Sequence, residues 1–204
     1  MTGPAVIAGF YGKVPARGDF VRSGLPRAFT DPWDDWMRMA IAGSRARMGD
    51  DWLAAYLEAP IWRFALPAGL CGGLPVVGSM LPSVDKAGRY FPLTFAALCD
   101  RSASIDTWLD RCEDAGLSAL EQDIVPDAIA EQIGQPDPAL HDRDRAGAAS
   151  CDSIWWTEGA PRVQPSRLTF HGMPDAAAYA AMLGDTREPA ANGPLEEVSW
   201  ELPS

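Results

Sequence analysis

Residues 90–98 constrain the fold of this 204-residue chain most strongly. They form an apolar run with little alternation, a pattern typical of a strand that is covered on both faces. Residues 61–66 and 75–81 precede it and predict a hairpin around a Pro/Gly-rich turn. Helical patterns stand before and after these three strands. We therefore expect the α/β class, as a single-domain sandwich with a mixed sheet.

The clearest helix is expected from Asp31, a good N-cap residue, with Pro32 at the first helical position and Gly49 just beyond the end. Further strands are expected at 5–10 and 153–157, further helices at 52–57, 102–123, 126–134 and 174–183, and a polar loop at 135–149. We expect residues 1–184 to form one domain and residues 185–204 to form an acidic, Pro/Gly-containing tail that is loosely held.

The net charge of −11 is unevenly distributed. Residues 1–99 carry ten Lys/Arg and eight Asp/Glu, whereas residues 100–204 carry seven and twenty. Because such a chain repels phosphate backbones and anionic lipids, we expect neither nucleic acid nor a membrane surface as a partner. The acidic half either meets a basic protein surface or serves only to keep the chain in solution.

The cysteines suggest the compartment. Cys71, Cys99, Cys112 and Cys151 are far apart and form no C-x-x-C pair, which favours reduced thiols over disulfides or a zinc site. The N-terminus lacks a basic segment followed by an apolar run, and no stretch of about 18 apolar residues is present. We therefore expect a cytoplasmic protein without membrane insertion.

Only two lysines occur, against fifteen arginines, and each lies in a short, charge-dense segment punctuated by glycine. Residues 9–20 contain Lys13, and residues 83–93 contain Lys86. In one interpretation the two loops form a charged recognition patch; in the other their charges pair internally and only pin the loops. The candidate partner-binding residues are Lys13, Arg17, Asp19, Arg22, Ser83, Asp85, Lys86 and Arg89.

An enzymatic interpretation starts from the same segment. Ser83 and Lys86 match the S-x-x-K of acyl enzymes that recognise penicillin, but the companion motifs are absent and prolines and glycine flank the segment. His141 and His171 have no partners at metal-ligand spacing, and no phosphate-binding glycine motif occurs, so we expect no metal and no cofactor. The alternative function is a small hydrolase or ligand-binding enzyme that uses Ser83, Asp85 and Lys86.

Two adjacent tryptophans, Trp155 and Trp156, point to opposite faces if residues 153–157 form a strand. One of them is expected in the core. The other either covers a second face of the sheet or serves as an exposed anchor for a partner.

Several segments, in order, resemble the TagF family of type VI secretion system-associated proteins. The resemblance starts at residues 9–21 and continues through Leu25-Pro26-Arg27 with Trp33 and Trp36. It then includes residues 59–64, 82–93 and 153–157.

The resemblance implies a compact three-layer α/β/α domain. It also implies a cytoplasmic, non-enzymatic regulator that represses the secretion system after translation. It further implies that this regulator binds the forkhead-associated scaffold protein of the apparatus. The resemblance assigns no catalytic residues to this chain. A third possibility places the interface on the acidic helices at 102–134, around Glu113, Asp114, Glu121 and Asp123.

Overall fold

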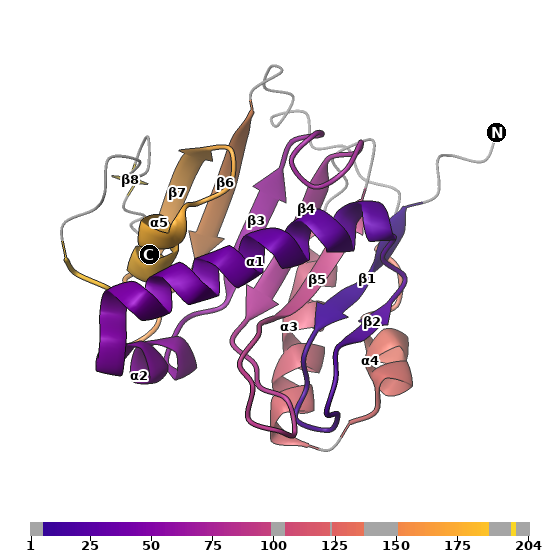
Figure 1. Cartoon of the computed structure of the whole chain (residues 1–204). Coiled ribbons are helices and arrows are strands. Elements are labelled where there is room, and N and C mark those ends of the chain that lie inside the picture. Colours follow the sequence, from indigo (N-terminus) through magenta and orange to yellow (C-terminus); the bar gives the residue numbers. More distant parts are fainter. Residues whose placement is uncertain (1–5, 99–104, 123, 137–150, 188–196, 199–204) are drawn as a thin grey trace, which may run out of the picture.

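The structure, a computed structural model of the chain, describes residues 6–98, 105–122, 124–136, 151–187 and 197–198. Its centre is an eight-stranded sheet with the order β2-β1-β5-β4-β3-β6-β7-β8 (Figure 1). The strands are β1 (Ile7–Gly12), β2 (Val21–Ser23), β3 (Trp62–Leu66), β4 (Val76–Leu81), β5 (Leu93–Leu98), β6 (Asp152–Thr157), β7 (Ser166–His171) and β8 (Glu197–Val198).

The α/β class is confirmed, but the prediction of a mixed sheet is wrong. All neighbouring strands in the sheet pair antiparallel. Neighbouring parallel strands need a crossover connection, usually one helix that returns the chain to the starting edge of the sheet. Here two helices, α3 (Asp106–Glu121) and α4 (Pro126–Ile133), separate β5 from β6. The second helix reverses the direction once more, so β6 enters the sheet antiparallel to its neighbours.

Helices pack against both faces of the sheet (Figure 1). On one face lie α1 (Arg27–Met48), the short 3₁₀ turn η1 (Gly49–Asp51), α2 (Trp52–Leu57) and α5 (Ala176–Met182). Their buried side chains share one apolar core with residues of β3, β6 and β7. Helices α3 and α4 enclose a second core with residues of β1 and β5 on the other face.

Strand β5 separates the two cores, as expected from its sequence. All six of its residues are buried. Ala96 and Leu98 belong to the core beneath α1, whereas Phe95 and Ala97 belong to the core beneath α3. The missing alternation in the sequence therefore reflects a strand that is covered on both sides.

Helix α1 begins earlier than the sequence predicts. It starts at Arg27 after Pro26, so Pro32 lies inside the helix and Asp31 is not the N-cap. Phe29 is fully buried and stacks on Trp33 with ring centroids 5.5 Å apart. This burial extends the apolar stripe by one turn and outweighs the single backbone hydrogen bond that Pro32 removes.

The other expected helices and strands are present, with ends shifted by a few residues, whereas β2, β7 and β8 were not predicted. In β7 the buried Leu168 and Phe170 alternate with less buried residues, a weak signal that was visible in the sequence. The polar loop at 135–149 and most of the acidic tail lie outside the described residues. At the start of the tail, Asp185 accepts a hydrogen bond from Nε of Arg47 at 2.6 Å.

Candidate functional site

The two lysine-containing loops, residues 13–20 and 82–92, meet at one end of the sheet. The first connects β1 to β2, and the second connects β4 to β5. Because β1 and β4 both pair antiparallel with β5, the end of each of them lies beside the start of β5. We call these segments the lysine loops. The sequence alone left their adjacency undecided.

Hydrogen bonds to backbone carbonyl oxygens join the lysine loops directly. The amide of Lys86 donates to the carbonyl oxygen of Arg17 at 2.8 Å. The hydroxyl of Ser83 donates to the carbonyl oxygen of Lys13 at 2.6 Å. At Gly12 the backbone has φ +149°, and a Cβ there would collide with the carbonyl oxygen of Pro92. The glycine of the first motif therefore permits the close approach that joins the loops.

A buried ion pair lies at the centre of this junction. Nζ of Lys13 is 2.8 Å from Oδ2 of Asp85, and the two side chains are 7% and 0% exposed. The ammonium also lies over the ring of Phe20, 5.0 Å from its centroid. Lys13 thus has a carboxylate on one side and an aromatic face on the other, so it is not available to a partner surface.

Asp85 organises its own loop as well as binding Lys13. Its Oδ1 accepts the backbone amides of Ala87 and Arg89, each at 2.9 Å, and its Oδ2 accepts Nε of Arg89 at 2.7 Å. Burial acts to raise the pKa of Asp85. The hydrogen bonds from Lys13 and from Arg89 outweigh burial and hold that pKa well below its ordinary value. The carboxylate is therefore a fixed anion at neutral pH.

Helix α2 anchors the second loop from beneath. The hydroxyl of Tyr56 donates to the carbonyl oxygen of Ser83 at 2.9 Å and accepts the amide of the same residue at 3.1 Å. Burial raises the pKa of Tyr56 well above its ordinary value, so this phenol keeps its proton. One tyrosine thus bonds both backbone groups of Ser83, whose carbonyl oxygen also accepts the amide of Phe91 at 3.1 Å.

The structure separates the predicted site residues into a buried set and an exposed set. Lys13, Ser83 and Asp85 are buried and hold the loops together. Trp155 is fully buried in the core beneath α1, so it is not an exposed anchor. Trp156 is half-buried and packs against the opposite core. The exposed members are Arg17, Asp19, Arg22, Lys86 and Arg89.

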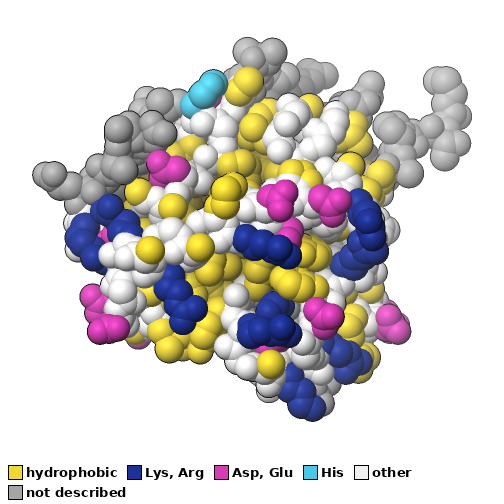
Figure 2. Space-filling view, viewed as in Figure 1, with side chains coloured by type: hydrophobic (Ala, Val, Ile, Leu, Met, Phe, Trp, Pro, Cys, Tyr) yellow, Lys and Arg dark blue, Asp and Glu magenta, His cyan; other side chains and the backbone are white. Residues whose placement is uncertain are grey.

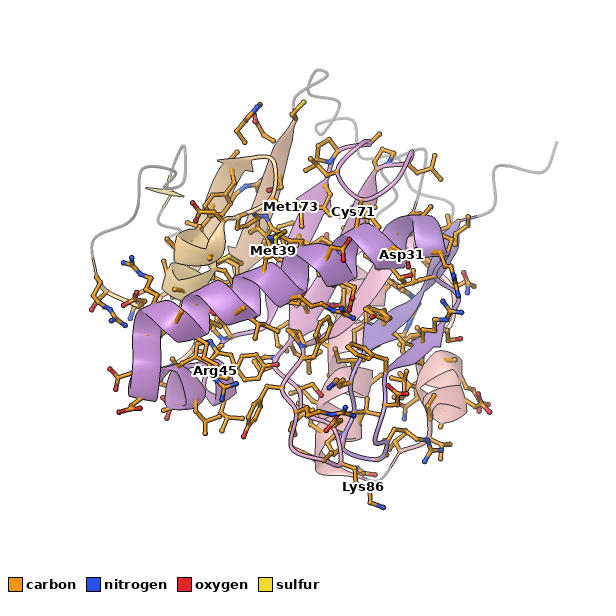
Figure 3. The ribbon with its side chains drawn as sticks, in the orientation of Figure 1. Asp31, Met39, Arg45, Cys71, Lys86 and Met173 are labelled. Carbon is orange, nitrogen blue, oxygen red and sulfur yellow. The ribbon has the colours of Figure 1, made fainter. Side chains whose placement is uncertain are left out.

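The exposed cations form one edge of the molecule. A terminal nitrogen of Arg89 donates to the carbonyl oxygen of Gly18, which is a fourth link between the loops. Figure 3 shows Lys86 at the far end of the loops with its side chain directed away from the ribbon. Within the described part of the chain, neither Lys86 nor Arg17 takes part in an ion pair. The positive charges of Arg17 and Lys86 are therefore exposed on loops whose backbone is held in place by hydrogen bonds.

The proposed acyl-enzyme geometry is not formed. Ser83 and Lys86 do not lie one helical turn apart, because residues 82–89 form a turn closed by the bridge between Val84 and Tyr90. The hydroxyl of Ser83 is committed to the carbonyl oxygen of Lys13. Lys86 is exposed to solvent and is not enclosed beside that hydroxyl.

A groove between α1 and the end of the second lysine loop was not predicted from the sequence. It has a volume of about 570 Å³ and runs between α1 and residues 90–91. Its sequence signal was weak, since two arginines seven residues apart on a helix are common. The lining residues are Arg38, Ile41, Ala42, Arg45, Ala46, Tyr90 and Phe91.

A second cavity of about 160 Å³ lies on the other face of the sheet, beside Trp156. Arg63 at its edge donates to Glu113 at 2.6 Å and to Asp110 at 2.6 Å. The hydrogen bond to Glu113 is the largest effect on the guanidinium, and the pKa of Arg63 is raised despite partial burial. Glu113 is thus occupied in attaching α3 to the sheet, whereas Asp114 and Glu121 are exposed. Asp123 lies outside the described residues.

Among the described residues, no group of three His, Cys, Asp or Glu side chains could hold a metal ion. His171 is exposed and faces Asp152 at 3.0 Å, and His141 lies outside the described residues. None of the described helices is long and apolar enough to cross a membrane.

Comparison with known proteins assigns the family. No curated protein matches the chain. The crystal structure of PA0076 from Pseudomonas aeruginosa PAO1 superposes with a TM-score of 0.78 at 34% sequence identity, covering 92% of this chain and 98% of that one. Residues 9–135 match the family model described as the TagF N-terminal domain, type VI secretion system-associated. The matched region contains both lysine loops and the helix that lies above them, and the chain belongs to the TagF family of type VI secretion system-associated proteins.

Proposed function

We propose that this chain is a non-enzymatic, cytoplasmic regulator that represses a type VI secretion system after translation by binding its forkhead-associated scaffold protein. Membership of the TagF family is the observation that carries this proposal. The chemistry of the lysine loops agrees with a binding role. Their buried polar groups are engaged in fixing backbone, and their exposed groups are charged side chains of the kind that steer a protein partner.

The proposed contact surface is the exposed edge of the lysine loops. Arg17 and Lys86 extend from the two loops on either side of the hydrogen bond that joins them. The Lys13–Asp85 pair and the Tyr56 hydroxyl keep this backbone in place. A surface that is already ordered loses little conformational freedom when a partner binds, which favours affinity.

The test is capture of the purified scaffold protein by an Arg17→Glu/Lys86→Glu variant. Both positions are exposed, so we expect an unchanged melting temperature and at least about a tenfold loss of affinity, because two attractive charges become repulsive. The matched control is Arg27→Glu/Arg111→Glu, which makes the same change in net charge at exposed positions outside the lysine loops.

Equal capture by the loop variant and the control would remove the lysine loops from the interface. A failure of the unmodified chain to bind the scaffold at all would instead reject the proposed partner. Charge reversal at Asp114 and Glu121, which are exposed on α3, tests the alternative interface on the acidic helices.

A further inference from the structure

We infer that the groove between α1 and residues 90–91 binds a segment of a partner protein in which an apolar side chain stands between two carboxylates. The inference rests on the proposed function only in requiring a protein partner. It concerns a surface that is separate from the exposed edge of the lysine loops.

The floor of the groove is apolar and its ends are cationic. Ile41, Ala42, Tyr90 and Phe91 line it between two arginines of α1. Arg38 and Arg45 are seven residues apart, which is about two helical turns or about 10 Å along the axis. Figure 2 shows the apolar surface next to α1 with Lys and Arg side chains around it. An occupant that satisfies both ends needs two negative charges at this spacing and an apolar group between them.

The charge of the groove is local and opposite in sign to that of the chain. Arg45 has no carboxylate partner among the described residues; its guanidinium lies 5.1 Å from the ring centroid of Trp52. Arg38 contacts Asp34 through Nε at 2.7 Å, but its side chain remains 65% exposed. Figure 3 shows Arg45 projecting from α1 on the side of α2. Arg45 is therefore expected to contribute more to binding than Arg38.

Aromatic contacts hold the floor of the groove in position. Phe91 packs against Phe20 with ring centroids 4.8 Å apart and against Tyr11 at 5.9 Å. Tyr90 packs edge-on against Trp52 at 5.8 Å and against Tyr56 at 5.6 Å. Because these rings are already packed, a ligand does not have to order them, and the binding site is preorganised.

The spacing defines the probes. A carboxylate pair about 10 Å apart on one face corresponds to positions i and i+7 of a helix. In an extended segment, positions i and i+4, about 13 Å apart, are the nearest pair on one face that leaves a position on the same face between them. Two fluorescein-labelled peptides therefore carry Glu at those positions with Leu between them in an Ala/Gln background. Matched peptides carry Gln in place of Glu. Fluorescence anisotropy with the full chain measures binding at low and high salt.

We expect at least one Glu peptide to bind about tenfold more tightly than its Gln counterpart, with the difference shrinking as salt is raised. Arg45→Glu should weaken this binding by at least about tenfold. Ala42→Trp fills the groove from an exposed helical position and should abolish binding without a change in charge. The control is Arg27→Glu, an exposed arginine of the same helix outside the groove, which should bind as the unmodified chain does.

Failure of both Glu peptides to bind, or unchanged binding by Arg45→Glu and Ala42→Trp, overturns the inference. Self-association of the chain that Ala42→Trp abolishes, seen as a change in sedimentation, identifies a second copy of the chain as the occupant and also overturns it. Scaffold capture separates this result from the proposed function. If Arg45→Glu captures the scaffold normally while binding no peptide, the groove serves another partner and the proposed function is unaffected.

Discussion

The Lys13–Asp85 pair shows how one contact explains two sequence motifs. Each loop contains one of the two lysines, yet only Lys86 is exposed. Lys13 reaches across 72 positions of sequence to Asp85 and is enclosed there. Removing one partner of a buried pair leaves an uncompensated charge, which costs more than the pair itself contributes.

We expect Lys13→Met to lower the free energy of unfolding by about 3 kcal/mol, because Asp85 then stays buried with only Arg89 opposite it. Lys86→Met, at an exposed position, should change it by less than about 0.5 kcal/mol. Urea denaturation of both variants measures the difference. Equal stabilities would show that Lys13 does not anchor the loops.

Asp85 also predicts a pH dependence. Its pKa is lower in the folded chain than in the unfolded one, so its contribution is fully present above the unfolded pKa of about 4 and is lost as pH falls through the folded value. The stability difference between the unmodified chain and Asp85→Asn should therefore stay constant from pH 7 to 5 and shrink below about pH 4. A difference that is already shrinking between pH 7 and 6 would contradict this.

At the scale of helices and strands, the crossing of α1 and α5 depends on a glycine. A Cβ built at Gly43 in α1 would collide with Cβ of Ala176 at the start of α5. A glycine inside a helix costs about 1 kcal/mol relative to alanine. The close helix contact offsets that cost, as does the burial of Tyr179 and Met182 from α5 in the core below.

Gly43→Ala should accordingly destabilise the chain by about 1–2 kcal/mol although it favours the isolated helix, because the two helices must separate. The double variant Gly43→Ala/Ala176→Gly restores the space and should recover most of the loss. Thermal melts of the single and double variants decide this. A stabilised single variant would mean that α5 moves away at no cost.

At the scale of the whole molecule, one sheet carries two cores and couples them. Trp155 and Trp156 are adjacent in β6, yet they pack against opposite cores. Strand β5 divides its buried residues in the same way. Both cores pack against the same sheet. Unfolding of one core should therefore remove the support of the other.

We therefore expect a single unfolding transition whichever core is damaged. Trp155→Ala in the first core and Leu109→Ala in the second should lower stability by about 4 and about 3 kcal/mol respectively. Far-UV circular dichroism and tryptophan fluorescence should give coincident melts for both variants. Two separated transitions in either variant would show that the cores unfold independently.

Local chemistry made much of the fold predictable. The unbroken apolar run of β5 identified a doubly covered strand, and the hairpin β3–β4 followed from its Pro/Gly turn. Strand direction was not predictable, although both helices between β5 and β6 were, because it depends on which strands become neighbours and on where the helices pack. The start of α1 was missed because burial of Phe29 outweighed the capping preference of Asp31.

The sequence by itself determined the family, the α/β class and the two segments that carry the site, because each depends on the order and type of neighbouring residues. Only the tertiary structure decided which charges are buried and which are free. It placed Asp85 against Lys13 and left Lys86 in solvent, and it brought Tyr90 and Phe91 beneath two arginines of α1. Those outcomes depend on distances between residues far apart in the chain, and no local pattern encodes them.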